Sequence, residues 1–310
     1  MTRAQSRWLM LITGLGTLLV VAVVSLLVAY VAADAALKPD PPKNTPYLDQ
    51  FPFPVEEIEF LARDKTPLAG WFLAAAPPRG EAPTTVPTPT VILMHGYGGT
   101  RDVMLPYASF LSNAGFHVFF FDARGVGHSA RVEVTFGERE KLDVFGAIDY
   151  LSKRPEVDQS RIAIMGVELG GSVAIMAAAE DRRIAAVVAE APYASLDLAL
   201  QDALDRTVAV PRLLRPLTTY MVKRRIAVNI EDRAPVAAVA ALGGRPLFII
   251  EDSREHTDQT QAMFAAAQQP KTLWVAHGAA LGEGLKEFPI EYVTRVLEFL
   301  RSNIGATPKR

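Results

Sequence analysis

The chain has 310 residues, half of them hydrophobic, and a formal net charge of −2 at pH 7. This length is sufficient for one large domain or two small ones, and the near-neutral charge lacks the basic footprint of a nucleic-acid-binding protein. Because the sequence contains no cysteine, disulfides, thiolate metal ligands and a cysteine nucleophile are excluded.

The first distinctive segment is Trp8–Ala33, which contains no charged residue. At ~1.5 Å per residue this run is long enough to cross a ~30 Å hydrocarbon core. Arg3 and Arg7 precede it and Asp34 follows, so the positive-inside rule places the N-terminus in the cytoplasm. Residues 1–36 are therefore predicted to anchor a single-pass protein in the plasma membrane, with the remainder outside. A cleaved signal peptide is the alternative, although its apolar region usually has only ~7–15 residues.

The next segment, residues 37–54, is rich in proline and is predicted to be a stiff, extended linker. A single domain is expected over residues 55–306. It begins with two alternating apolar segments, 55–62 and 68–75, on either side of the charged turn "RDKT". Alternation around a charged turn is typical of an antiparallel strand pair.

The remaining sequence alternates apolar strands with helices, which indicates a parallel sheet covered on both faces. Residues 193–243 interrupt this rhythm with helical sequence of mixed polarity and are predicted to form a lid over the strand ends. The expected strands are 90–95, 117–122, 161–166, 184–190, 246–250 and 271–276, and the expected helices are 101–114, 137–152, 169–180, 257–268 and 287–304.

Six short motifs follow one another in an order that is informative as a set. They are "HGYGG" at 95–99, "FDARGVGHS" at 121–129, "TFGEREKLDVFGAIDYL" at 135–151, "GVELGG" at 166–171, "PLFIIEDSRE" at 246–255 and "LWVAHGAALGEG" at 273–284. Together they resemble the α/β-hydrolase superfamily, specifically its serine-aminopeptidase-like and monoacylglycerol-lipase-like branch. The resemblance implies a mostly parallel eight-stranded sheet with helices on both faces and a helical lid.

The resemblance also implies where a catalytic site would lie. In the family a strained Gly-x-Ser-x-Gly turn presents the nucleophile, a histidine takes its proton, and a carboxylate orients the histidine. The three corresponding positions in this sequence are Glu168, Glu255 and Leu281, and all three differ from the family pattern. The backbone N–H groups of Tyr97 and Leu169 occupy the positions of the oxyanion hole. The pattern implies no cofactor and no metal.

Glu168 admits several interpretations. A carboxylate nucleophile still requires a base to activate water, and Leu281 cannot supply one. His277 is a substitute base only if its loop rearranges, and His256 is a weaker candidate. Ser172 lies a full helical turn beyond Glu168, so it is expected to pack the helix against the sheet.

Two further interpretations involve the charge of Glu168. With Glu255 and Asp252 it has the hard oxygen ligands that a divalent cation prefers, although no dedicated metal-binding loop is present. Alternatively, its carboxylate faces the positive end of the helix that starts at Leu169 and fills the oxyanion hole itself. We expect this last arrangement, in which the pocket has lost its chemistry.

The sequence therefore predicts a membrane-anchored pseudohydrolase that binds or scaffolds. A small-molecule, lipid or protein ligand is expected at the lid pocket, and no nucleic-acid partner. The alternative function is an active esterase or peptidase that uses Glu168 with His277 as its base.

Overall fold

A central sheet of eight strands organises the computed structural model, which describes residues 3–39, 54–76, 86–207, 210–227, 234–251 and 257–305. The strand order is β1-β2-β4-β3-β5-β6-β7-β8, and β1, β2 and β4 pair antiparallel while all other neighbours are parallel. The predicted mostly parallel, eight-stranded sheet is confirmed. The strands are β1 (Val55–Leu61), β2 (Pro67–Leu73), β3 (Thr88–Met94), β4 (His117–Phe121), β5 (Val157–Val167), β6 (Ile184–Glu190), β7 (Leu247–Glu251) and β8 (Lys271–Val275).

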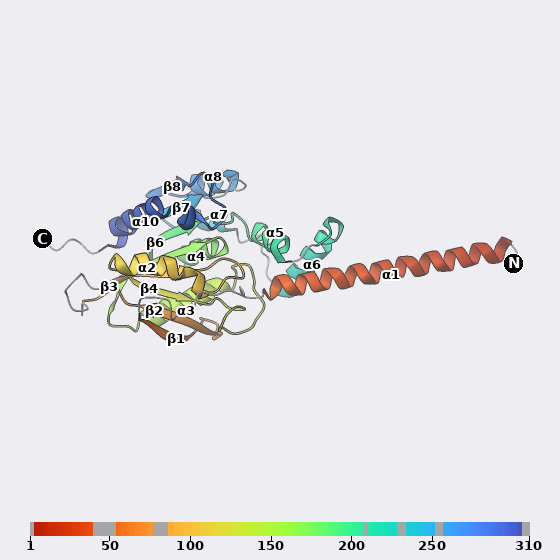
Figure 1. Cartoon of the computed structure of the whole chain (residues 1–310), viewed down its shortest axis with the longest axis horizontal. Helices are drawn as coiled ribbons and strands as arrows, with labels where there is room; N and C mark the ends of the chain where they lie inside the picture. The colour runs from red at the N-terminus through yellow and green to blue at the C-terminus, as the bar shows by residue number, and fades with distance from the viewer. Residues whose placement is uncertain are drawn as a thin grey trace.

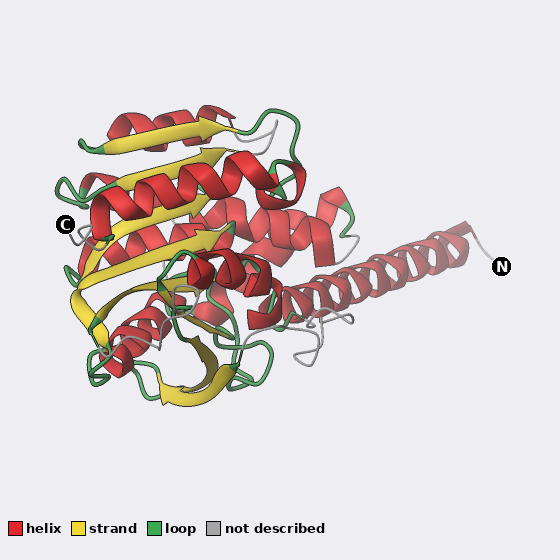
Figure 2. Ribbon diagram, turned by 60° about the vertical axis from the view of Figure 1, so that its left-hand side comes forward, coloured by secondary structure: helices red, strands yellow, loops and turns green. Residues whose placement is uncertain are grey.

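Helices cover both faces of this sheet (Figure 2). Buried residues of α2 (Leu105–Asn113) and α10 (Pro289–Ile304) belong to one core cluster, and those of α3 (Glu140–Leu151) and α4 (Leu169–Glu180) belong to the other. The second cluster also contains residues of the shorter α7 (Pro235–Ala240) and of α8 (Thr257–Ala266). Two short helices, η2 (Arg101–Met104) and α9 (Gly284–Glu287), precede α2 and α10.

Apolar runs within the central strands explain why both faces are covered. In β4, Phe119 and Phe121 pack into one core cluster while Val118 and Phe120 pack into the other, and all four are fully buried. Successive strand residues point to opposite faces, so a strand without polar positions requires protein on both sides. Burial of each phenylalanine contributes roughly 1.5–3 kcal/mol.

The lid consists of α5 (Leu196–Thr207), η3 (Arg212–Leu214) and α6 (Arg215–Ile226), followed by α7. It projects from the domain beside the N-terminal helix α1 (Arg3–Leu37), which extends well beyond the domain (Figure 1). By length and composition α1 is a candidate membrane span.

The C-terminal turns of α1 are part of the folded domain. Ala29, Ala32, Ala33, Ala36 and Leu37 are fully buried, and α1 packs against α5 and α6. The C-terminal end of the helix therefore docks directly on the domain. Residues 40–53 of the predicted linker lie outside the described residues.

One helix begins later than the sequence pattern indicates. The expected helix 137–152 starts at Glu140, because the carboxylate of Glu140 accepts hydrogen bonds of 2.7 Å from the N–H groups of Thr135 and Gly137. Gly137 has a φ of 115°, which favours glycine and forms a turn before the helix.

Candidate functional site

The turn between β5 and α4 places Glu168 at the carboxyl edge of the sheet. Glu168 has a φ of 52° and a ψ of −117°, a backbone conformation that non-glycine residues rarely adopt. Neighbouring glycines permit the turn: a Cβ on Gly166 would lie 2.2 Å from the carbonyl oxygen of Gly170, and a Cβ on Gly170 would lie 2.3 Å from that of Met94. The strained turn therefore presents the Glu168 side chain at the edge where sites of parallel sheets occur.

The carboxylate of Glu168 forms an ion pair with an arginine of the lid. Arg206, on α5, has its Nη1 3.0 Å from Oε2 and 3.2 Å from Oε1 of Glu168. The Nε of Arg206 lies 2.8 Å from Asp202, which also accepts a hydrogen bond from the hydroxyl of Tyr193. Only 11% of the Glu168 side chain is exposed, so the arginine replaces much of the water that a free carboxylate would bind.

The negative charge of Glu168 raises the pKa values of the neighbouring Tyr193 and Arg206. Burial raises the pKa of Tyr193, and the negative charge of Glu168 raises it further. Burial lowers the pKa of Arg206, but its interactions with the charged carboxylates of Glu168 and Asp202 raise it overall. Tyr193 therefore keeps its proton, and Arg206 keeps its positive charge beside the carboxylate.

A cavity of about 240 Å³ opens above Glu168. A Cβ on Gly96 would lie 2.9 Å from Oε2 of Glu168, and a Cβ on Gly282 would lie 3.0 Å from Oε1, so both glycines are needed to accommodate the carboxylate. Among the described residues that line the cavity there is no histidine. They are Gly96, Tyr97, Gly99, Val103, Met104, Tyr107, Val167, Glu168, Arg206 and Gly282.

Of the two positions expected to form an oxyanion hole, Tyr97 lines this cavity, whereas Leu169 adjoins Glu168 without being one of the described lining residues. The hydroxyl of Tyr97 donates a 2.7 Å hydrogen bond to the carbonyl of Ala36 in α1. Leu169 is buried and is the first residue of α4, directly after Glu168. The role of their N–H groups stays a prediction.

His95 holds the loop that carries Tyr97. Its Nδ1 lies 2.8 Å from the carbonyl of Gly96, and its Nε2 accepts a 3.0 Å hydrogen bond from the N–H of Ala123. Burial lowers the pKa of His95, so the ring is neutral with the proton on Nδ1. Both ring nitrogens are engaged in holding the loop.

The loop after β8 brings one predicted site position toward the elbow. Leu281 is partly buried against the hydrophobic core, and the adjacent Gly282 approaches the Glu168 carboxylate. His277 is exposed and does not line the cavity. Glu255, His256 and Asp252 lie outside the described residues.

Ser172 has the structural role expected for it. It is fully buried, its Oγ accepts a 2.8 Å hydrogen bond from the N–H of Tyr193, and it donates to the carbonyl of the same residue at 3.2 Å. These bonds join α4 to the chain that leaves β6. The hydroxyl is therefore used to fix the start of the lid.

Two residues of functional interest were not anticipated. Arg206 was not anticipated because it lies in a lid helix that contains several charged residues, so its charge did not distinguish it. Glu190 ends the apolar strand β6 and is fully buried; its carboxylate accepts hydrogen bonds from the hydroxyls of Tyr107 (3.2 Å) and Tyr292 (2.5 Å) and from the N–H of Gly284 (3.0 Å). Glu190 therefore joins the cavity wall to the loop after β8. Its position as the acidic last residue of an otherwise apolar strand could have marked it in the sequence.

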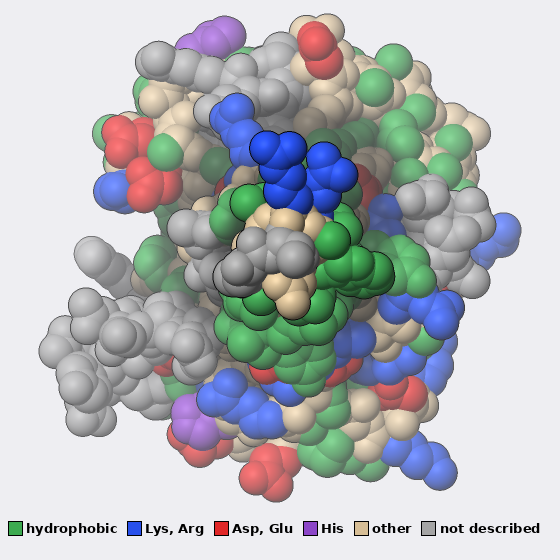
Figure 3. All heavy atoms as spheres, turned by 90° about the vertical axis from the view of Figure 1, so that its right-hand side faces the viewer, with side chains coloured by type: hydrophobic (Ala, Val, Ile, Leu, Met, Phe, Trp, Pro, Cys, Tyr) green, Lys and Arg blue, Asp and Glu red, His purple; other side chains and the backbone are tan. Residues whose placement is uncertain are grey.

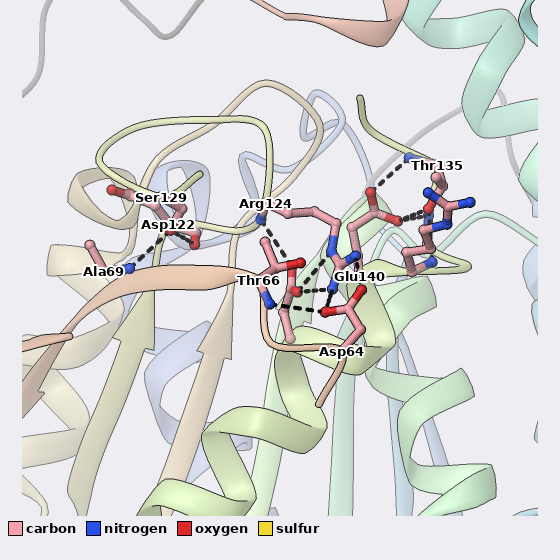
Figure 4. Close-up of polar contacts among 11 residues, drawn as sticks. Asp64, Thr66, Ala69, Asp122, Arg124, Ser129, Thr135 and Glu140 are labelled. Atoms are coloured by element: carbon pink, nitrogen blue, oxygen red, sulfur yellow. Dashed lines mark hydrogen bonds and ion pairs between the residues drawn. The ribbon is translucent and has the colours of Figure 1, made fainter. Parts of the chain in front are cut away.

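The turn after β4 is fixed by buried charges (Figure 4). Arg124 lies 2.7 Å from Asp64 and 2.6 Å from Asp143, and Ser129 donates a 2.6 Å hydrogen bond to the carbonyl of Asp122. The two carboxylates engage the guanidinium from different elements. These residues support the scaffold and do not line the cavity above Glu168.

Clusters of three or more histidine, cysteine, aspartate or glutamate residues able to hold a metal ion are absent from the part of the chain that the structure describes. Asp252 and Glu255 lie outside that part, so the metal interpretation of Glu168 is not tested by it.

Comparison with known proteins finds a family match and similar solved structures. Residues 85–279 match the family described as serine aminopeptidase, S33. The Pyrococcus furiosus esterase Pf2001 superimposes with a TM-score of 0.67 and 25% identity, covering 86% of this chain and all of the esterase chain.

Proteins of similar sequence include an uncharacterized protein and a thiohydrolase. The uncharacterized protein YfhR of Salmonella typhi is 25% identical over 314 aligned residues, covering 96% of this chain and 97% of YfhR. The thiohydrolase aneE of Aspergillus aculeatus is 32% identical over 141 residues, covering 44% of this chain and 41% of aneE. The family match covers more than half of the chain, and this chain therefore belongs to the serine aminopeptidase S33 family within the α/β-hydrolase superfamily.

Proposed function

We propose that this protein is a membrane-anchored pseudohydrolase that binds a small ligand in the cavity above Glu168 without hydrolysing it. The ion pair between Glu168 and Arg206, at 3.0 Å, carries the proposal. A nucleophile must present an available electron pair to the substrate, whereas both oxygens of this carboxylate lie within 3.2 Å of a guanidinium nitrogen.

The surroundings of Glu168 support the same conclusion. A carboxylate nucleophile forms an ester with the substrate, and hydrolysis of that ester requires a base to activate water. Leu281 has no lone pair, and His277 lies on the exposed surface. A fixed negative charge at the elbow also opposes the negative charge that develops on the oxygen of an acyl-transfer intermediate.

The cavity suits a compact ligand. Its volume of about 240 Å³ lies below the roughly 300–1,000 Å³ of sites for drug-sized molecules. Glu168 and Arg206 supply one charge of each sign, while Val103, Met104 and Val167 supply an apolar wall. A small molecule with both polar and apolar parts matches this lining. A lipid and a protein that contacts the lid are the alternative partners.

The anchoring part of the proposal rests on α1. Residues 8–28 of this helix are apolar and outward-facing, and at ~1.5 Å per residue they cover about 32 Å, the thickness of a hydrocarbon core. Arg3 and Arg7 before the apolar run favour a cytoplasmic N-terminus by the positive-inside rule. Reporter fusions at each terminus, together with alkaline extraction of membranes, test the span, its orientation and the plasma-membrane location.

Activity assays test the catalytic part. The detergent-solubilised full chain should not be labelled by a fluorophosphonate probe, and it should not turn over short-chain esters or aminoacyl substrates. Turnover that is lost in Glu168→Gln or in His277→Ala would refute the proposal and support the active alternative, with His277→Ala testing that base specifically.

A reconstruction provides the positive control. The triple variant Glu168→Ser, Glu255→Asp and Leu281→His restores the family's nucleophile, acid and histidine, and it removes the charge that pairs with Arg206. We expect it to gain measurable esterase activity and probe labelling. A folded but inactive triple variant would indicate that the cavity itself no longer positions an ester.

A further inference from the structure

The lid presents an unusual surface around the base of α1. The segment Arg212–Ile226, which comprises η3 and α6, contains five lysine or arginine residues and no aspartate or glutamate. Two large side chains of this segment are strongly exposed: Leu213 at 89% and Tyr220 at 61%. Exposed apolar side chains among basic ones are typical of protein surfaces that contact a membrane interface.

Contacts with α1 fix the position of this segment. Arg225 of α6 lies 2.8 Å from Asp34 of α1, also pairs with Glu133, and places its guanidinium 5.6 Å from the ring centre of Tyr30. The lid therefore packs along the last turns of α1. Figure 1 shows the lid projecting on the side toward which α1 extends.

The dimensions of α1 locate the bilayer relative to the lid. If outward-facing residues 8–28 span the hydrocarbon core, the docked residues 29–37 occupy about 13 Å of helix beyond it. The headgroup layer on each side of a bilayer is roughly 5–8 Å thick. A lid that packs along these docked turns is thus brought to the headgroup layer.

The positive charges of the lid segment are suited to a position at the headgroup layer. Figure 3 views the domain from the end of α1 and shows lysine and arginine side chains, with some acidic ones, around the apolar helix in projection. In the lid segment, Arg212 and Arg224 are exposed, whereas Lys223 and Arg225 form ion pairs with Asp197 and Asp34. Exposed basic side chains near a bilayer are attracted by anionic lipids.

We infer that η3 and α6 form a membrane-contacting surface that binds anionic phospholipid headgroups, with Leu213 and Tyr220 inserted at the interface. This inference rests on the anchoring by α1 proposed above. The occupant of the surface is the bilayer that holds α1, because the helix and the lid are packed together. The lid that carries Arg206 to Glu168 is therefore also the part of the domain that meets the membrane.

The absence of cysteine makes the test direct. The single-cysteine variants Leu213→Cys and Tyr220→Cys of the full chain are labelled with an environment-sensitive fluorophore. The labelled proteins are reconstituted in phosphatidylcholine vesicles with or without phosphatidylglycerol, and lipids that carry a nitroxide on the headgroup or on the acyl chain serve as quenchers for the lid positions and for position 20, respectively. Val20→Cys, in the middle of α1, reports on anchoring, and Val86→Cys, 54% exposed beside the amino end of β3, is the matched control away from the lid.

We expect a blue shift and headgroup quenching at positions 213 and 220 in vesicles that contain phosphatidylglycerol, and neither effect at position 86. Quenching at position 20 but not at 213 or 220 would overturn the lid inference while leaving the anchoring intact. Loss of quenching at position 20 as well would show that the anchoring itself has failed.

Charge reversal tests the recognition of headgroups. In the Leu213→Cys background, Arg212→Glu with Arg224→Glu should reduce the quenching in phosphatidylglycerol vesicles toward the level in phosphatidylcholine. Arg182→Glu, an exposed arginine beyond the C-terminal end of α4, should leave the quenching unchanged. Equal quenching in the double variant and the parent would overturn the role of anionic lipid.

Discussion

The ion pair between Glu168 and Arg206 should be measurable as a coupling energy. Two charges about 4 Å apart attract by about 4 kcal/mol at an effective dielectric constant near 20, and exposed pairs contribute only about 0.2–1 kcal/mol. Here the Glu168 side chain is 11% exposed but that of Arg206 is 39% exposed, so solvent screens part of the attraction. We expect a coupling energy of about 1–2 kcal/mol.

A double-mutant cycle of Glu168→Gln and Arg206→Met measures this energy, since glutamine keeps the shape of the side chain and methionine keeps much of its apolar stem. The free energy of unfolding of the detergent-solubilised full chain is followed by circular dichroism. Arg206→Met should be the more damaging single change, because it also leaves Asp202 without its partner at 2.8 Å. For a domain of this size, each kcal/mol corresponds to a change in Tm of about 2–4 °C.

A distant arginine supplies the control. Arg63 pairs with Asp149 and Asp181, so Arg63→Met combined with Glu168→Gln should be additive within about 0.5 kcal/mol. If the Glu168 and Arg206 changes were equally additive, the carboxylate would not be held by the lid, and the principal support for a non-nucleophilic Glu168 would be lost.

Further predictions concern the scaffold of the site. Gly170→Ala should destabilise the fold by about 3 kcal/mol or more in chemical denaturation, although alanine normally favours helices, because its Cβ would lie 2.3 Å from the Met94 carbonyl; unchanged stability would contradict the geometry of the turn. Glu190→Ala should cost about 3 kcal/mol or more by the same measurement, since it removes three buried hydrogen bonds, and a loss below 1 kcal/mol would argue against them. Hydrogen bonding to Arg124 lowers the pKa of Asp64 from 3.8 to about 2, which stabilises the fold above pH ~4 and is lost as the pH falls through 2. Asp64→Asn should therefore cost about 1 kcal/mol at pH 7 after allowance for its exposure, and the difference from the parent protein should shrink toward pH 2; a difference independent of pH would refute this.

The sequence was most informative where local chemistry determines local structure. The glycines around Glu168 marked the junction of β5 and α4, and the predicted helix 169–180 has the observed boundaries. The start of α3 was misplaced by three residues because the decisive interaction is a side-chain carboxylate that caps a turn. The mostly parallel eight-stranded sheet and its two-sided burial followed from the apolar strands and the resemblance to a known family, whereas the strand order was not predicted.

The contacts that define the site were harder to predict from the sequence. Arg206 reaches Glu168 across 38 residues, and this pairing depends on how the lid packs. The docking of α1 did leave a signal: Ala29, Ala32, Ala33 and Ala36 follow the spacing of one helical face, and they are the residues that the domain buries. Because these alanines continue the apolar run that predicts a membrane span, the sequence alone did not show where the exposed part of the helix ends and the docked part begins.

The hydrogen bond from Tyr97 to Ala36 connects the end of α1 to the wall of the cavity. A proteolytic cut after Ala35, such as a signal peptidase would make, would detach Ala29, Ala32, Ala33 and Asp34, leaving their contact surface on the lid bare and Arg225 without its aspartate partner. The fold thus incorporates the end of its apolar N-terminal helix as a structural element of the domain. If α1 spans a membrane as proposed, a tilt of the helix would be transmitted through this hydrogen bond to the wall of the cavity above Glu168.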